Sequence, residues 1–175
     1  MELFLRNNDY KYAVEQIMLM LFPEERPVYP EAPGGGLRAE LSLGSGRVYE
    51  TAFCRITGER GRFDGAARIR LPESADDIER ERLRQRIVKL SFYRAGIKYL
   101  GTKPVWGALS GIRPGKLMSV LLEQGLSDRA ALRRFMQLYD TDETRARLCL
   151  DTAHAALSAE HGLGARDVCL YLGIP

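Results

Sequence analysis

The sequence contains few of the residues that most often carry chemistry. Its 175 residues include two histidines and three cysteines. Cys54, Cys149 and Cys169 are odd in number, far apart and set in apolar stretches, which argues against disulfides and favours thiols that pack as small apolar side chains. His154 and His161 have no cysteine or carboxylate at a recognised metal-ligand spacing. The sequence therefore predicts structural or solvent-exposed roles for these residues and no metal site.

Long apolar runs are also missing. The longest, residues 17–22, is far shorter than the roughly 20 residues that span a bilayer. The first residues lack the basic start and the apolar run of a signal peptide. We therefore expect a cytoplasmic protein without a membrane segment.

Neither the charge nor the glycines indicate a ligand. The 26 basic and 23 acidic residues leave a formal net charge of +3 that is spread along the chain, which does not by itself imply nucleic acid. The glycine run at residues 34–36 lacks the Lys-Ser/Thr of a phosphate loop. Acidic residues lie near arginines, so no isolated carboxylate pair suits acid-base catalysis. By itself this stretch is expected to be non-catalytic.

Alternating and helical periodicities organise the first hundred residues. Arg38, Glu40 and Ser42 alternate with apolar residues, and so do Arg68 and Arg70, which indicates strands with one solvated face. The pattern predicts a strand at residues 3–5, a helix at 9–22, strands at 37–43, 47–57 and 63–71, and a long helix ending near residue 99. The predicted fold class is α+β, with an antiparallel sheet in βαβββα order.

Two local details of this region are also predicted. On the second hairpin strand, Val48 is expected to face the core together with Cys54 and Ile56. Ser74 followed three residues later by Asp77 has the form of a capping box for the long helix.

After residue 101 a glycine-punctuated segment precedes three helices. Pro114 suits a first helical turn, Gly125 ends that helix, Ser127 caps the next, and Asp140 or Thr141 caps the third. Residues 168–172 form a continuous apolar run typical of a strand buried on both faces. We expect an accessory subdomain at residues 1–101, a three-helix subdomain at 102–163, and at 164–175 the first strand of a sheet that the chain does not complete.

Two cations and an aromatic residue are candidates for binding. Arg113 and Lys116 stand at the start of a helix, near Trp106, and cations at the positive end of a helix are locally unfavourable. Something else is therefore expected to hold them. The alternatives are a carboxylate or carbonyl group of a neighbouring subdomain, or a ligand or nucleic acid.

Two segments resemble a known family. Val168-Cys169-Leu170-Tyr171-Leu172-Gly173-Ile174-Pro175 resembles the first barrel strand of radical S-adenosylmethionine enzymes of the oxygen-independent coproporphyrinogen III oxidase group. Trp106-Gly107-Ala108-Leu109-Ser110-Gly111-Ile112-Arg113-Pro114-Gly115-Lys116-Leu117 is similar to a segment of the Firmicutes-type coproporphyrinogen dehydrogenases. The first hundred residues match that group in arrangement alone.

The resemblance implies that the chain is the amino-terminal accessory region of such an enzyme, ending just before a Phe-Cys-xxx-Cys-xx-Cys motif. That motif would hold a 4Fe-4S cluster with one iron free for S-adenosylmethionine, and the barrel would decarboxylate coproporphyrinogen III oxidatively. Tyr171 matches the family tyrosine near S-adenosylmethionine. Gly173 stands where authenticated coproporphyrinogen oxidases have histidine, and similar relatives include haem chaperones. The implied partners are the chain's own barrel and a porphyrinogen or other small substrate.

Two other classes of function stay open. The order of helix, three strands and helix is shared with double-stranded RNA-binding modules, and the long helix is rich in arginine. Asp76, Asp77, Glu79 and Glu81 dilute that positive charge, which does not favour nucleic acid as a partner. Alternatively, the three late helices dock a protein partner through Trp106 and the nearby cations.

Overall fold

The computed structural model describes residues 1–46, 48–72, 74–109, 113–161, 164 and 167. The chain divides into two compact units, Met1–Pro104 and Val105–Pro175. Tyr171, Gly173 and the strand expected at residues 168–172 lie outside the described residues.

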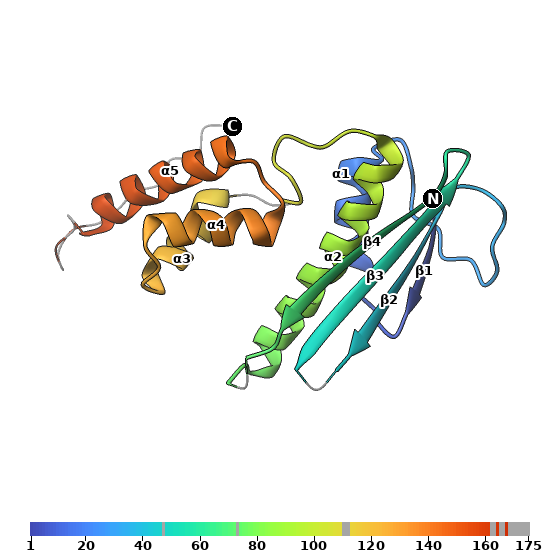
Figure 1. The fold of residues 1–175 in the computed structure, drawn as a ribbon, viewed down its shortest axis with the longest axis horizontal. Helices are drawn as coiled ribbons and strands as arrows, with labels where there is room; N and C mark the ends of the chain where they lie inside the picture. Colours follow the sequence, from blue (N-terminus) through green and yellow to red (C-terminus); the bar gives the residue numbers. More distant parts are fainter. Residues whose placement is uncertain (47, 73, 110–112, 162–163, 165–166, 168–175) are drawn as a thin grey trace. The chain divides into compact units, whose positions relative to one another are not determined.

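The first unit has the predicted α+β class and element order (Figure 1). Its elements are β1 (Glu2–Arg6), α1 (Lys11–Leu21), β2 (Arg38–Ser45), β3 (Tyr49–Gly58), β4 (Gly61–Arg70) and α2 (Asp77–Leu100).

The sheet is mixed, and the expectation of an antiparallel sheet is wrong for one strand pair. The strand order is β1-β2-β3-β4, with β1 parallel to β2 and the two remaining pairs antiparallel. Helix α1 lies between β1 and β2 in the chain, and a crossover of this kind returns the chain to the same end of the sheet. The tight turns after β2 and β3 reverse the chain and produce antiparallel pairs instead.

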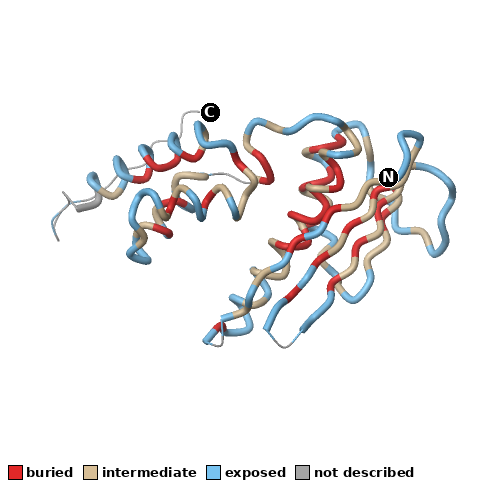
Figure 2. Tube along the Cα trace, in the orientation of Figure 1, coloured by how far each residue is buried: buried red, intermediate tan, exposed pale blue. Residues whose placement is uncertain are grey.

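One face of the sheet packs on α1 and α2, and the core lies between them. Leu41, Cys54 and Ile56 are buried from the sheet side, and Val14 and Phe92 from the helices. Buried and more exposed residues alternate along the strands, as Figure 2 shows. The period-two pattern therefore predicted this face correctly.

Glu50, a carboxylate, takes an inward position in β3, the strand on which Val48 was expected to face the core. Strand β3 begins at Tyr49, so Val48 lies before it and is 45% exposed, contrary to prediction. Glu50 is 1% exposed. Its Oε1 accepts hydrogen bonds from Arg84 Nε at 3.1 Å and Nη2 at 2.7 Å, and its Oε2 accepts one from the Ser45 hydroxyl at 2.7 Å. The burial is possible because these donors replace water.

Ser127 stands at the N-cap of α4 as predicted, without a side-chain cap hydrogen bond, whereas the caps of α2 and α5 differ from those predicted. Asp76, in extended conformation, caps α2 by accepting a hydrogen bond from the Glu79 amide at 2.7 Å, so Ser74 and Asp77 do not form the expected box. Asp142 accepts a hydrogen bond from the Arg145 amide at 2.8 Å at the start of α5. More than one Ser, Thr or Asp residue precedes α2 and α5, and the position of the first turn decides which of them caps the helix.

The second unit contains α3 (Pro114–Glu123), α4 (Asp128–Tyr139) and α5 (Glu143–His161). These bounds agree with the helices predicted from periodicity. Its core is built from residues of all three helices: Met118, Leu121, Ala131, Phe135, Ala146, Cys149, Leu150 and Ala153.

Among the described residues, no helix is long and apolar enough to cross a membrane.

Candidate functional site

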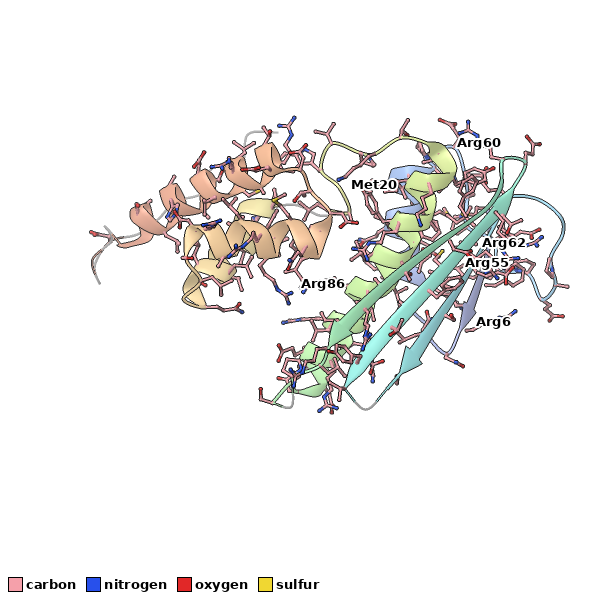
Figure 3. All side chains as sticks on the ribbon, in the orientation of Figure 1. Arg6, Met20, Arg55, Arg60, Arg62 and Arg86 are labelled. Carbon is pink, nitrogen blue, oxygen red and sulfur yellow. The ribbon has the colours of Figure 1, made fainter. Side chains whose placement is uncertain are left out.

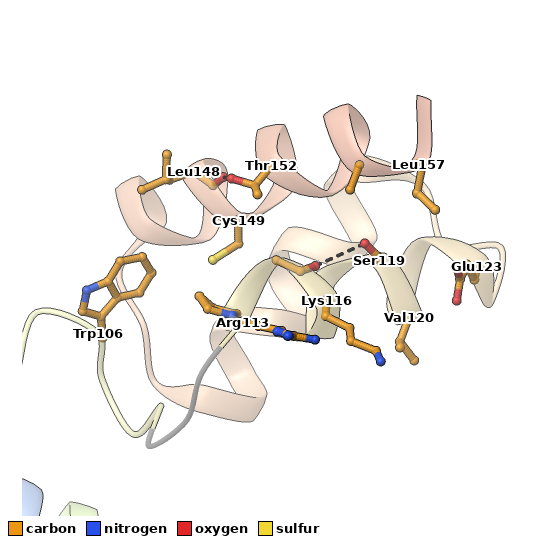
Figure 4. Close-up of a pocket in the computed structure, with 13 residues that line it drawn as sticks. Trp106, Arg113, Lys116, Ser119, Val120, Glu123, Leu148, Cys149, Thr152 and Leu157 are labelled. Carbon is orange, nitrogen blue, oxygen red and sulfur yellow. Dashed lines mark hydrogen bonds between the residues drawn. The ribbon is translucent and has the colours of Figure 1, made fainter. Parts of the chain in front are cut away.

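A groove of about 590 Å³ lies in the second unit between α3 and α5. Trp106, Arg113 and Lys116, which the sequence singled out, all line it (Figure 4). Val120 of α3 and Leu148 of α5 belong to its apolar walls. The structure thus brings together three candidates that span eleven positions of the sequence.

The start of α3 places the two cations. Pro114 occupies the first turn, and Arg113 before it has φ 73° and ψ 59°, the left-handed conformation that costs energy for a residue with a side chain. The amide of Lys116 donates to the Arg113 carbonyl at 3.1 Å, which closes this turn. A Cβ at Gly115 would lie 3.1 Å from the Thr152 side chain, so the small residue lets α3 approach α5 closely.

Trp106 is positioned by the segment that follows it. Gly107 has φ 62°, and a Cβ there would collide with the carbonyls of Tyr139 and Asp140. The next amide, of Ala108, donates to the Tyr139 carbonyl at 2.7 Å. These contacts attach the segment to the end of α4. The Arg145 guanidinium lies 5.2 Å from the centroid of the Trp106 ring, which holds the indole at the groove.

The charge of the groove is uneven. Arg113 and Lys116 are exposed, and neither forms an ion pair with a carboxylate of the described residues. Both stand at the positive end of α3, where the unpaired amides add to their field. Glu123, which also lines the groove, lies at the other end of the helix. The basic end therefore favours an anionic group, and the walls favour an apolar body attached to it.

The groove offers binding groups rather than reactive ones. Burial raises the pKa of the Cys149 thiol, which opposes formation of the thiolate. The Ser119 hydroxyl donates to the Gly115 carbonyl at 3.3 Å, as helical serines commonly do. His154 contacts Asp128 at 3.0 Å on an exposed helix surface outside the groove. Among the lining residues, no base is placed to activate a nucleophile.

Sequence reasoning missed the apolar wall supplied by α3 and α5. Val120 is 42% exposed and Leu148 is 47% exposed, although both are large apolar residues. The sequence of α3 did indicate this wall. Leu117 and Val120 are apolar but lie outside the buried stripe that contains Met118 and Leu121. The position of α5 opposite them could not be read from that pattern.

The thiols do not fit an iron-sulfur cluster. Cys54 and Cys149 are both buried, and they belong to different units. Burial raises the pKa of both thiols, that of Cys54 strongly. Among the described residues, no three His, Cys, Asp or Glu side chains gather to hold a metal ion. A cluster therefore has no ligand set in the part of the chain that the structure describes.

We expect Cys54 to be inert toward thiol reagents in the native protein. In a Cys169→Ser variant, a disulfide reagent at pH 8 should modify Cys54 only as fast as the first unit opens, since the thiol is buried and protonated. Because the folded pKa lies above the ordinary 9.0, the fold keeps its full stability below pH 9 and loses some as the pH rises further. Rapid native labelling, located by peptide mapping, would contradict the burial.

The chain matches no protein-family model and no curated protein sequence. Among solved structures it is similar to protein VC0702 from Vibrio cholerae, with a TM-score of 0.30 and 14% sequence identity. The match covers 91% of this chain and 97% of that one. Likeness at this level supports no inference about function, which has to come from the chain's own residues.

Proposed function

We propose that this chain is the amino-terminal accessory region of a radical S-adenosylmethionine protein similar to coproporphyrinogen dehydrogenase, and that the region is not itself catalytic. The observation that carries the proposal is the groove. Trp106, Arg113 and Lys116 belong to the segment that resembles this family, and they line one surface of the second unit. In the whole protein the reaction would be the oxidative decarboxylation of coproporphyrinogen III in haem biosynthesis.

The chemistry of the groove suits an accessory role. Two cations without an ion-pair partner among the described residues can bind a carboxylate of the catalytic barrel or of its substrate. The apolar walls and Trp106 can shield from water the hydrocarbon part that carries this carboxylate. The groove would then recruit or orient a group for the barrel, without moving protons or electrons itself.

The proposed cofactors belong to the catalytic part. A 4Fe-4S cluster and S-adenosylmethionine would supply the radical chemistry there. Cys54 and Cys149 are not proposed as ligands, because both thiols are buried in packed cores. Tyr171, a proposed S-adenosylmethionine contact, remains a sequence-based expectation.

The reading frame around this chain gives the first test. Phe-Cys-xxx-Cys-xx-Cys directly after Pro175 is expected, and the protein purified without oxygen should bind four irons per cluster and consume coproporphyrinogen III when given S-adenosylmethionine. A stop codon or unrelated sequence after Pro175 would overturn the proposal. If the protein binds the cluster but does not consume coproporphyrinogen III, the proposed enzyme class stands and this substrate is excluded.

Charge reversal in the groove tests the role of this region. In the whole enzyme, Arg113→Glu combined with Lys116→Glu should lower kcat/KM about tenfold, because a carboxylate partner would then be repelled. The cluster content should not change. The control is Lys103→Glu, which reverses an exposed cation outside the groove and should leave activity intact. If the groove variant is as active as the control, the groove has no role in the reaction.

A further inference from the structure

The sheet of the first unit has a second face that the helices do not cover. Helices α1 and α2 lie on one side of it, in Figure 1, where the buried residues point. The side chains that alternate with the buried ones, such as Phe4, Ser42 and Phe53, point the other way and are more exposed. We call this surface the open face. Its residues come from all four strands, and the strand register fixes which are neighbours.

An aromatic ring stands near the middle of the open face among small residues. In the register, Phe53 of β3 pairs with Ser42 of β2 and with Ala66 of β4. Two pairs further along the strands, and so on the same face, Thr51 has Gly44 beside it. These neighbours are too short to cover the ring, whereas the Arg55 guanidinium lies over it with its carbon 5.2 Å from the ring centroid, and Phe53 is half-buried. The part of the Phe53 ring that stays accessible offers a surface on which a flat group can stack.

The carboxylates of the open face are already engaged. Asp64 accepts two hydrogen bonds from Arg55, at 2.8 and 3.0 Å, and the Arg55 guanidinium holds the pKa of Asp64 below its usual range. Glu40 lies 3.4 Å from Arg38 and 4.0 Å from Arg6. Glu2 accepts hydrogen bonds from the Gly34 amide. None of the three acids is left to repel an incoming anion.

Three arginines of β4 have no such partner. Arg62, Arg68 and Arg70 are exposed on the edge strand and form no ion pair with a described carboxylate. Arg68 stacks instead on Tyr49, with its guanidinium carbon 3.6 Å from the ring centroid. At about 3.3 Å per residue, the three arginines extend over roughly 25 Å of strand. Figure 3 shows Arg62 and Arg55, which come from neighbouring strands.

We propose that the open face binds single-stranded nucleic acid, with the β4 arginines on phosphates and Phe53 stacked on a base. Protein surfaces that bind single-stranded nucleic acid without sequence preference typically combine a row of basic side chains with aromatic side chains on which bases stack. A duplex is not the occupant, since its bases are stacked inside and a flat sheet cannot reach them. An acidic polypeptide would use the arginines and would gain little from the half-buried aromatic ring. This binding is independent of the groove in the second unit.

The test measures fluorescence anisotropy of labelled single-stranded RNA and DNA, about 12 nucleotides long, with the full chain. Binding with a Kd of about 10 μM at moderate salt is expected, weakening steeply as salt rises. A duplex of the same sequence should bind less tightly. No binding at low ionic strength, or preference for the duplex, would overturn the proposal.

Matched variants locate the surface. Changing Arg62, Arg68 and Arg70 to glutamine should weaken binding at least tenfold and lower the salt slope by about 2, since three phosphate contacts are lost. The control changes Arg129, Arg133 and Arg134 to glutamine, which removes the same charge from exposed positions of α4 and should alter Kd less than threefold. Equal losses in both triple variants would mean that only net charge matters and would refute the site.

Phe53→Thr separates stacking from charge. Threonine suits a half-buried strand position and cannot stack, so binding should weaken about tenfold at constant salt slope. Far-UV circular dichroism checks that the variant is folded. Unchanged affinity, together with equally tight binding of polyglutamate, would show an acidic-protein surface in place of the proposed one.

Discussion

Replacing Gly65 with alanine is expected to destabilise the first unit by about 3 kcal/mol and to lower its melting temperature by about 10 °C or more. Gly65 lies on β4 where the strand crosses α2. A Cβ at this position would collide with the Ser91 carbonyl oxygen and the Ala95 nitrogen, both of which are backbone atoms of the helix. Backbone cannot yield as a flexible side chain can, so the strand and helix would have to separate.

Urea unfolding followed by circular dichroism measures this effect. Gly36→Ala is the matched control, because a Cβ there has no atom within 4 Å and the residue does not need a left-handed backbone. The chain's single tryptophan, Trp106, belongs to the second unit, so its fluorescence provides an internal reference for that unit. Equal unfolding midpoints for the two variants would show that β4 and α2 are less closely packed than the structure indicates.

Replacing Arg84 with methionine is expected to cost about 3 to 5 kcal/mol, because it leaves the buried Glu50 carboxylate without its charged partner. The Glu50 side chain is 2% exposed and that of Arg84 is 32% exposed, so water can reach the arginine and not the carboxylate. The Ser45 hydroxyl would remain as a donor, and one neutral hydrogen bond does not replace a bidentate guanidinium.

Two further variants test that explanation by chemical denaturation. Glu50→Leu together with Arg84→Met removes both charges and should recover most of the lost stability, since the penalty comes from the unpaired charge. Arg55→Met breaks the more exposed pair with Asp64 and should cost much less. A double variant as unstable as Arg84→Met would mean that the loss comes from packing of the arginine stem instead.

The sequence predicted the order and the kind of elements in both units. Ser127 was expected to cap the second of the three late helices, and α4 spans Asp128–Tyr139 directly after it. Local sequence patterns are enough to place a helix, because apolar periodicity determines its extent, and residues such as Pro114 and Gly125 affect only the backbone within a few positions of themselves. The direction of β1 relative to β2 was predicted wrongly, since it depends on the end of the sheet to which the crossover through α1 returns the chain.

The candidate site was predicted in part for a similar reason. Trp106, Arg113 and Lys116 are near neighbours in the chain, so unusual local features identified them together. Leu148 and Thr152 come from a helix about thirty residues away, and no local pattern connects them to α3. The open face shows the same limit: Arg68 and Arg70 were expected on a solvated side, whereas the small residues around Phe53 became neighbours only through strand register.

The sequence by itself determined where helices and strands form and which face of each is apolar, because these properties depend on side chains one to four residues apart. The tertiary structure alone decided which charges have partners. Glu50 tolerates burial because Arg84, 34 positions away, reaches it. Arg62, Arg68 and Arg70 of β4 form no ion pair with a carboxylate in the described part of the chain, where the sheet places Asp64 against Arg55. Whether two charged side chains pair depends on their distance in space. The composition counts paired and unpaired charges alike, and only the fold distinguishes them.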